Sequence, residues 1–136
     1  MKITRFEDLD VWKESRVLVN MVYDLTSKTL FQKDFGLKEQ IQRASVSCML
    51  NVSEGFDSGT NPQFIQHLIY VRRSSSEVQS ILYVALDRKY ISLKEFESVF
   101  ERAKNVGKLS NGFIRYLKNS ALNKQQDKKQ DNRLTG

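Results

Sequence analysis

A seam of seven residues at helical spacing constrains the fold of this chain more than any other feature of its sequence. The seam residues recur at alternating steps of four and three: Phe64, Leu68, Val71, Ser75, Val78, Leu82 and Ala85. A sustained mean spacing of about 3.5 residues is typical of long helices that pack side by side in bundles or coiled coils. Residues 62–87 are therefore predicted to form one long helix of a helical bundle.

Three further stretches space their apolar residues as helices do: residues 8–26, 34 to 55 or 59, and 92–119. Ser92 and Glu95 form a capping box at the start of the last stretch, and Ile91 and Phe96 stand at the hydrophobic-staple positions. Connections of roughly 4 to 9 residues force neighbouring long helices to run antiparallel. The predicted fold is all-α, an up-down-up-down antiparallel four-helix bundle over residues 1–119.

The end of the chain differs in composition from the predicted bundle. The run from Asn123 to Arg133 contains no apolar residue. A segment of this kind has too little apolar surface to bury against a core. Residues 120–136 are predicted to be a disordered, polar and basic tail.

Counts of single residue types exclude several kinds of site. With one cysteine, Cys48, and one histidine, His67, one chain can form neither an internal disulfide nor a multi-histidine metal site. No cofactor or metal is expected.

Residues 1–10 turn acidic where a signal peptide needs an apolar run, and no stretch approaches the roughly 20 apolar residues of a membrane span. The expected location is the cytoplasm, without membrane contact.

Positive charge is concentrated in the second half of the chain. Residues 1–60 hold 8 Lys/Arg and 9 Asp/Glu, a net charge of −1, whereas residues 61–136 hold 14 and 7, a net charge of +7. Four cations and an asparagine step by 4, 3, 4 and 3 residues along the predicted helix 92–119: Lys104, Lys108, Asn111, Arg115 and Lys118. At about 100° of rotation per residue they occupy one strip about 80° wide.

This acid-free strip has two interpretations. Cations in a row can follow a phosphate backbone and bind RNA or DNA without sequence selectivity. The alternative is an ordinary solvated helix face. We assign Arg72 and Arg73, in the middle of the predicted helix 62–87, to the same candidate nucleic-acid surface.

A polar row lies beside the apolar seam of the predicted helix 34–59. Its residues step by 3, 4, 4 and 3: Gln40, Arg43, Ser47, Asn51 and Glu54. In a structural interpretation Arg43 pairs with Glu77 and the Ser and Asn groups bond one another, which fixes the helix register or a subunit contact. The alternative is a binding groove. We favour the structural interpretation.

The sequence gives little support to an enzyme. Cys48 and His67 can face each other across two helices, as a nucleophile and its base would. However, Cys48 belongs to an apolar seam, where a free cysteine behaves as a small hydrophobe. We therefore expect no catalytic residues.

A family resemblance rests on three stretches: residues 6–13, 37–55 and 74–78 with 90–91. The most specific reads QIQRASVSCMLNVSEG over residues 40–55. The chain resembles the small four-helix-bundle proteins encoded in intervening sequences of bacterial large-subunit rRNA genes, whose pattern is close to Q-I-R-R-A-x-x-S-I-x-x-N-I-A-E-G. Cys48, Val52 and Ser53 depart from it, as does Arg73, where the family has a small residue. The polar row with Glu77 matches the family without any proven chemistry.

The resemblance implies a homo-oligomer, typically a pentamer, without known enzymatic activity. A related branch comprises the accessory variability determinant proteins of diversity-generating retroelements, which are basic pentamers that bind nucleic acid and a reverse transcriptase. We therefore expect a non-catalytic homo-oligomer that binds RNA or DNA through basic faces. The alternative is a protein–protein scaffold that docks a partner enzyme such as a reverse transcriptase.

Overall fold

The computed structural model describes the backbone of residues 2–135 and the side chains of residues 2–120. Its elements in chain order are η1 (Phe6–Asp8), α1 (Asp10–Thr26), α2 (Thr29–Lys33), α3 (Phe35–Asp57), α4 (Asn61–Asp87) and α5 (Leu93–Thr135). No strand occurs within residues 2–135, so the all-α prediction is confirmed. The tail predicted over 120–136 lies, apart from Ser120, outside the residues whose side chains are described.

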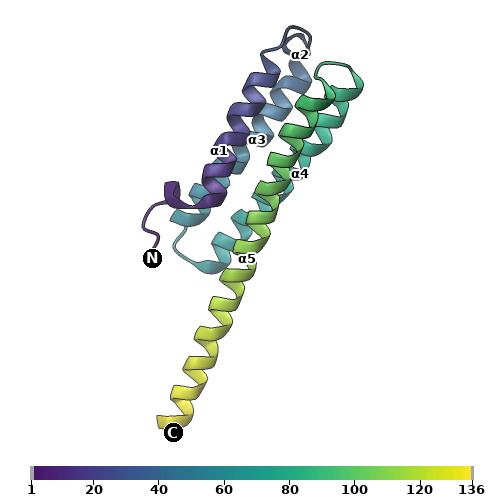
Figure 1. Ribbon diagram of the computed structural model, residues 1–136. Helices are drawn as coiled ribbons and strands as arrows, with labels where there is room; N and C mark the ends of the chain where they lie inside the picture. The colour runs from purple at the N-terminus through teal and green to yellow at the C-terminus, as the bar shows by residue number, and fades with distance from the viewer. Residues whose placement is uncertain (1, 136) are drawn as a thin grey trace.

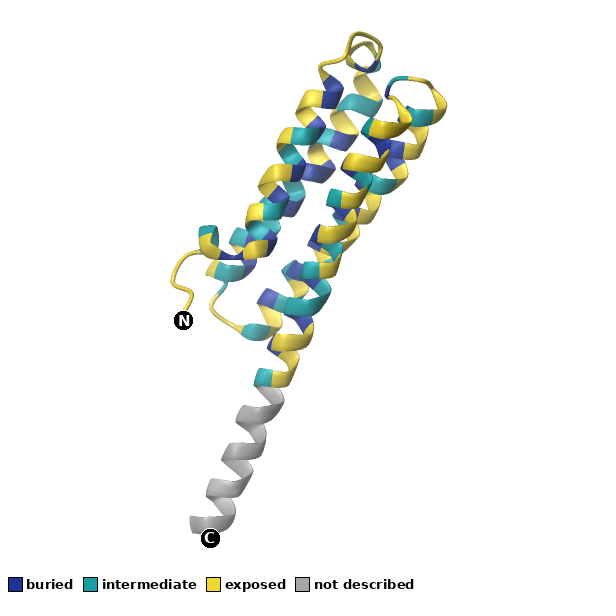
Figure 2. Cartoon of the chain, in the orientation of Figure 1, coloured by how far each residue is buried: buried dark blue, intermediate teal, exposed yellow. Residues whose placement is uncertain are grey.

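The four long helices lie side by side around one core (Figure 1). α1 packs against α3 and α5, and α4 packs against the same two helices. Buried residues face inward along each helix while exposed residues cover the outside (Figure 2). All seven residues of the seam in α4 are buried, as their spacing predicts. None of the described helices is both long and apolar enough to cross a lipid bilayer.

The capping box at the start of α5 is confirmed. The Glu95 amide donates to Ser92 Oγ at 3.1 Å, and the Ser92 amide donates to Glu95 Oε1 at 2.8 Å. The Glu95 carboxylate also forms an ion pair with Lys28, which follows α1. The hydrogen bond from Lys28 is the main cause of a lowered pKa of Glu95, and the bond from the Ser92 amide is the second cause. This carboxylate thus joins the start of α5 to the connection after α1.

Two local features differ from the sequence prediction. The short helix α2 was not predicted, because five residues are too few to show a helical period. This helix buries Phe31, which is fully inaccessible to solvent. The ring centroids of Phe31 and Tyr90 are 5.4 Å apart. In addition, α1 begins at Asp10 rather than residue 8, because the 3-10 turn η1 precedes it and places Phe6 against Trp12.

The crossing of α3 and α4 is unusually close at Gly55. A Cβ atom at this position would lie 2.8 Å from His67 Cβ and 2.9 Å from Phe64 Cδ1. Real Cβ atoms do not approach other atoms this closely, so a side chain here requires the helices to move apart. By contrast, a Cβ at Gly112 in α5 would meet nothing within 4 Å.

We therefore expect opposite effects from alanine at these two helical glycines. Gly55→Ala should lower the free energy of unfolding by about 1–3 kcal/mol, because the core cannot accept the added methyl group. Gly112→Ala, the matched control, should raise it by about 0.5–1 kcal/mol, because the unfolded chain loses conformational freedom. Urea unfolding followed by circular dichroism measures both changes. Equal effects at the two positions would contradict the close crossing.

Candidate nucleic-acid interface

The predicted strip on α5 is exposed. Lys104, Lys108, Arg115 and Lys118 are open to solvent, and Asn111 is half-buried. Four ion pairs join a lysine or arginine to a carboxylate among the described side chains, and none of them includes these four cations. Within the part of the chain whose side chains are described, the strip therefore keeps its positive charge unneutralised.

Arg72 extends the strip onto α4. Its Nη1 donates to Asn111 Oδ1 at 2.9 Å, across the line where α4 and α5 meet. We call Arg72, Lys104, Lys108, Arg115 and Lys118 the α4–α5 basic surface. Arg73 is also exposed, but it points about 100° further round α4. No hydrogen bond or ion pair between described side chains joins Arg73 to α5, so the structure does not bring it into this surface.

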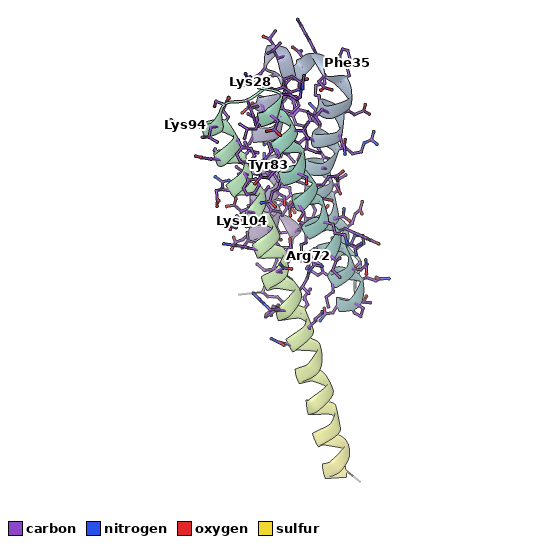
Figure 3. All side chains as sticks on the ribbon, turned by 90° about the vertical axis from the view of Figure 1, so that its right-hand side faces the viewer. Lys28, Phe35, Arg72, Tyr83, Lys94 and Lys104 are labelled. Atoms are coloured by element: carbon purple, nitrogen blue, oxygen red, sulfur yellow. The ribbon has the colours of Figure 1, made fainter. Side chains whose placement is uncertain are left out.

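An aromatic cluster lies beyond the N-terminal end of the α5 cations. The Tyr83 ring centroid lies 4.9 Å from that of Phe96 and 5.6 Å from that of Phe100. Figure 3 shows Arg72, Tyr83 and Lys104 on the side that α4 and α5 form. The sequence prediction missed Tyr83. Its spacing of eleven residues from Arg72, about three helical turns, is the pattern that places both on one side of α4.

A groove of about 460 Å³ lies between α3 and α4. Three residues of the polar row line it, Gln40, Arg43 and Ser47, together with Gly36, Glu39, Ala44, Ser74 and Glu77. The predicted Arg43–Glu77 pair is wrong. Arg43 Nη2 instead donates to Glu39 Oε1 at 2.8 Å, one turn back on the same helix. Glu77 accepts a long hydrogen bond of 3.4 Å from Gln40 Nε2. The partner within α3 is favoured because an i, i+4 pair needs no reach across the groove.

The Ser and Asn groups of the row bond one another, as the structural interpretation predicts. Ser47 Oγ lies 3.0 Å from Ser74 Oγ, which links α3 to α4. Asn51 Nδ2 donates to Ser47 O at 2.9 Å and to Ser47 Oγ at 3.0 Å. Because the Asn51 Nδ2 group donates to Ser47, the Oδ1 atom of Asn51 faces His67, and an amide oxygen can only accept. His67 Nδ1 is therefore the donor in the 3.0 Å bond between them. The Glu54 carboxylate stands 3.9 Å from the same histidine nitrogen.

Cys48 and His67 do not form a nucleophile–base pair. Cys48 is fully buried, and its sulfur lies 3.6 Å from Ala44 O and 3.8 Å from Val71 O. Burial raises the pKa of the Cys48 thiol to about 12, so the thiol stays protonated at neutral pH. The histidine instead bonds Asn51. Among the described residues, no three His, Cys, Asp or Glu side chains come together as metal ligands do.

Comparison with known proteins places the chain in a family. The model of the 23S rRNA-intervening sequence protein family matches residues 7–112. The chain belongs to this family. The match extends from η1 to the middle of α5, so it includes the α3–α4 groove and the first half of the basic strip. None of the curated proteins matches the chain.

A solved structure has a similar fold. It is a crystal structure of a protein of unknown function from the S23 ribosomal protein family of Bacteroides thetaiotaomicron. The two proteins share 24% of their sequence, and the match covers 77% of this chain and 95% of the other with a TM-score of 0.71. At this identity the likeness supports the helical fold alone.

The hydrogen-bonded row predicts a stability effect. Asn51→Ala should lower the free energy of unfolding by about 1–3 kcal/mol, because half-buried partners on Ser47 and His67 lose their bonds. Gln40→Ala should change it by less than about 0.5 kcal/mol, since its one bond to Glu77 is long and exposed. Chemical unfolding of both variants tests this expectation. A similar loss in both would show that the buried network has no special part in joining α3 to α4.

Proposed function

We propose that this protein is a non-catalytic, nucleic-acid-binding homo-oligomer that holds RNA or DNA non-specifically on its α4–α5 basic surface. In this proposal each chain is an up-down-up-down antiparallel four-helix bundle, and several bundles, typically five, assemble with their basic surfaces outward. A ring of identical weak sites on one polymer raises the total affinity, because each further contact is made at high effective concentration.

The observation that supports the proposal is that four exposed cations of α5 share one strip with no acidic residue among them. Arg5, Lys28, Arg43 and Arg102 each pair with a carboxylate within the ion-pair limit of 4.0 Å. The four strip cations on α5 have no such partner among the described side chains. Unpaired cations on one face neutralise phosphates and release their counterions, which gives affinity without sequence readout.

A second candidate function is a protein–protein scaffold. Two large apolar side chains near the start of α3 support it: Phe35 is 72% exposed and Leu30, on α2, is 58% exposed. Exposed apolar groups that gather together mark interaction sites more often than isolated ones do. A pulldown after nuclease treatment separates the two functions, since only a scaffold retains its protein partner.

Nucleic-acid binding by this surface should depend strongly on salt. Lys108→Glu with Arg115→Glu should weaken binding to a structured RNA by at least about tenfold and reduce the slope of log K against log salt by roughly 1.4–1.8. The control is Lys13→Glu with Arg16→Glu, which makes the same charge change on exposed α1 positions. Fluorescence anisotropy at several salt concentrations measures both. Salt-independent binding, or an equal loss in the control, contradicts the proposal.

A further inference from the structure

Tyr83 combines exposure with rigid support. The residue is 52% exposed on α4, although it lies beside the buried seam. Phe96 and Phe100 hold its ring from α5, and their own centroids are 5.2 Å apart with planes inclined by 30°. A ring that is already fixed loses little conformational entropy when a flat ligand stacks on it.

The cluster stands at one end of the basic surface. Phe100 precedes Lys104 by four residues, a distance of about 6 Å along the axis of α5. Tyr83 therefore lies about one helical turn from the first cation, on the α4 side that also holds Arg72. A strand whose phosphates follow the cations reaches the aromatic ring with its next nucleotide.

Charge alone does not hold a strand at this end. Glu97 and Glu101 are both exposed on α5 just before Lys104, and their carboxylates repel phosphate. The row of cations thus stops where the aromatic cluster begins. Stacking of a base on an aromatic face is the interaction by which proteins hold unpaired bases without reading their sequence.

We propose that Tyr83 is a stacking platform for an unpaired base, so that the α4–α5 basic surface selects single-stranded over duplex nucleic acid. This inference rests on the proposed function, because the phosphates must first lie along the cations. In a duplex the bases stack on one another and their faces are not available to the tyrosine. Any base can occupy the platform, since every base has a flat face.

The test compares a single-stranded oligonucleotide with the duplex of the same length, in RNA and in DNA arms. Tyr83→Leu should weaken binding of both single strands about tenfold and leave the duplex unchanged. The salt slope should stay the same, because no phosphate contact is lost. Tyr83→Phe should bind as the natural protein does. Tyr23→Leu, at a tyrosine that is 48% exposed on α1, is the matched control and should have no effect.

A second readout does not depend on any variant. Single strands that contain 2-aminopurine should lose fluorescence when they bind the natural protein, because a stacked base is quenched. Unchanged fluorescence would overturn the proposal, as would equal losses for single strand and duplex in Tyr83→Leu. A changed sedimentation coefficient in that variant would also overturn it, since the tyrosine would then contact another copy of the chain.

The two proposals fail in different ways. If the double charge reversal at Lys108 and Arg115 leaves binding intact, the basic surface is wrong and the platform has no strand to hold. If that reversal weakens binding while Tyr83→Leu does not, the basic surface stands and the stacking inference alone is wrong.

Discussion

The packing of α4 against α5 brings Arg72 of α4 beside the exposed cations of α5. Contacts between the two helices occur along their shared length: the Phe64 and Phe113 ring centroids lie 5.0 Å apart, and a Cβ on Gly107 would lie 3.1 Å from Ser75 Oγ. Further along, Tyr83 meets Phe100. In these contacts, the residue number of the partner on α5 falls as the residue number on α4 rises. This register turns one row of cations on α5 into a surface that both helices share.

The α3–α4 side of the molecule behaves differently. Its polar residues are bonded to one another, and Arg43 pairs with Glu39 within α3. Every buried side-chain nitrogen or oxygen among the described residues has a hydrogen-bond partner. Satisfied polar groups of this kind fix the register of two helices and leave little capacity for a ligand. The proposed binding surface accordingly lies on the α4–α5 side.

Local patterns were predictable from the sequence, whereas the partners of Arg43 and Arg72 were not. The seam of residues 62–87 and the box at Ser92 depend on spacing along one segment, and both are confirmed. The choice of Glu39 over Glu77 by Arg43 depends on the distance across a groove, which spacing does not give. The same holds for the bond from Arg72 to Asn111, because it requires the register of α4 on α5. The exposure of the strip was predictable from its spacing along one side of the helix.

Lysine footprinting tests the basic surface most directly. Acetylation of the protein with and without a bound RNA, read by mass spectrometry, reports which amines the polymer covers. We expect RNA to protect Lys104, Lys108 and Lys118, while Lys13 and Lys94, which are exposed outside the strip, react equally in both samples. Equal reactivity of the three strip lysines with and without RNA, or protection of Lys13 and Lys94 instead, would contradict the account.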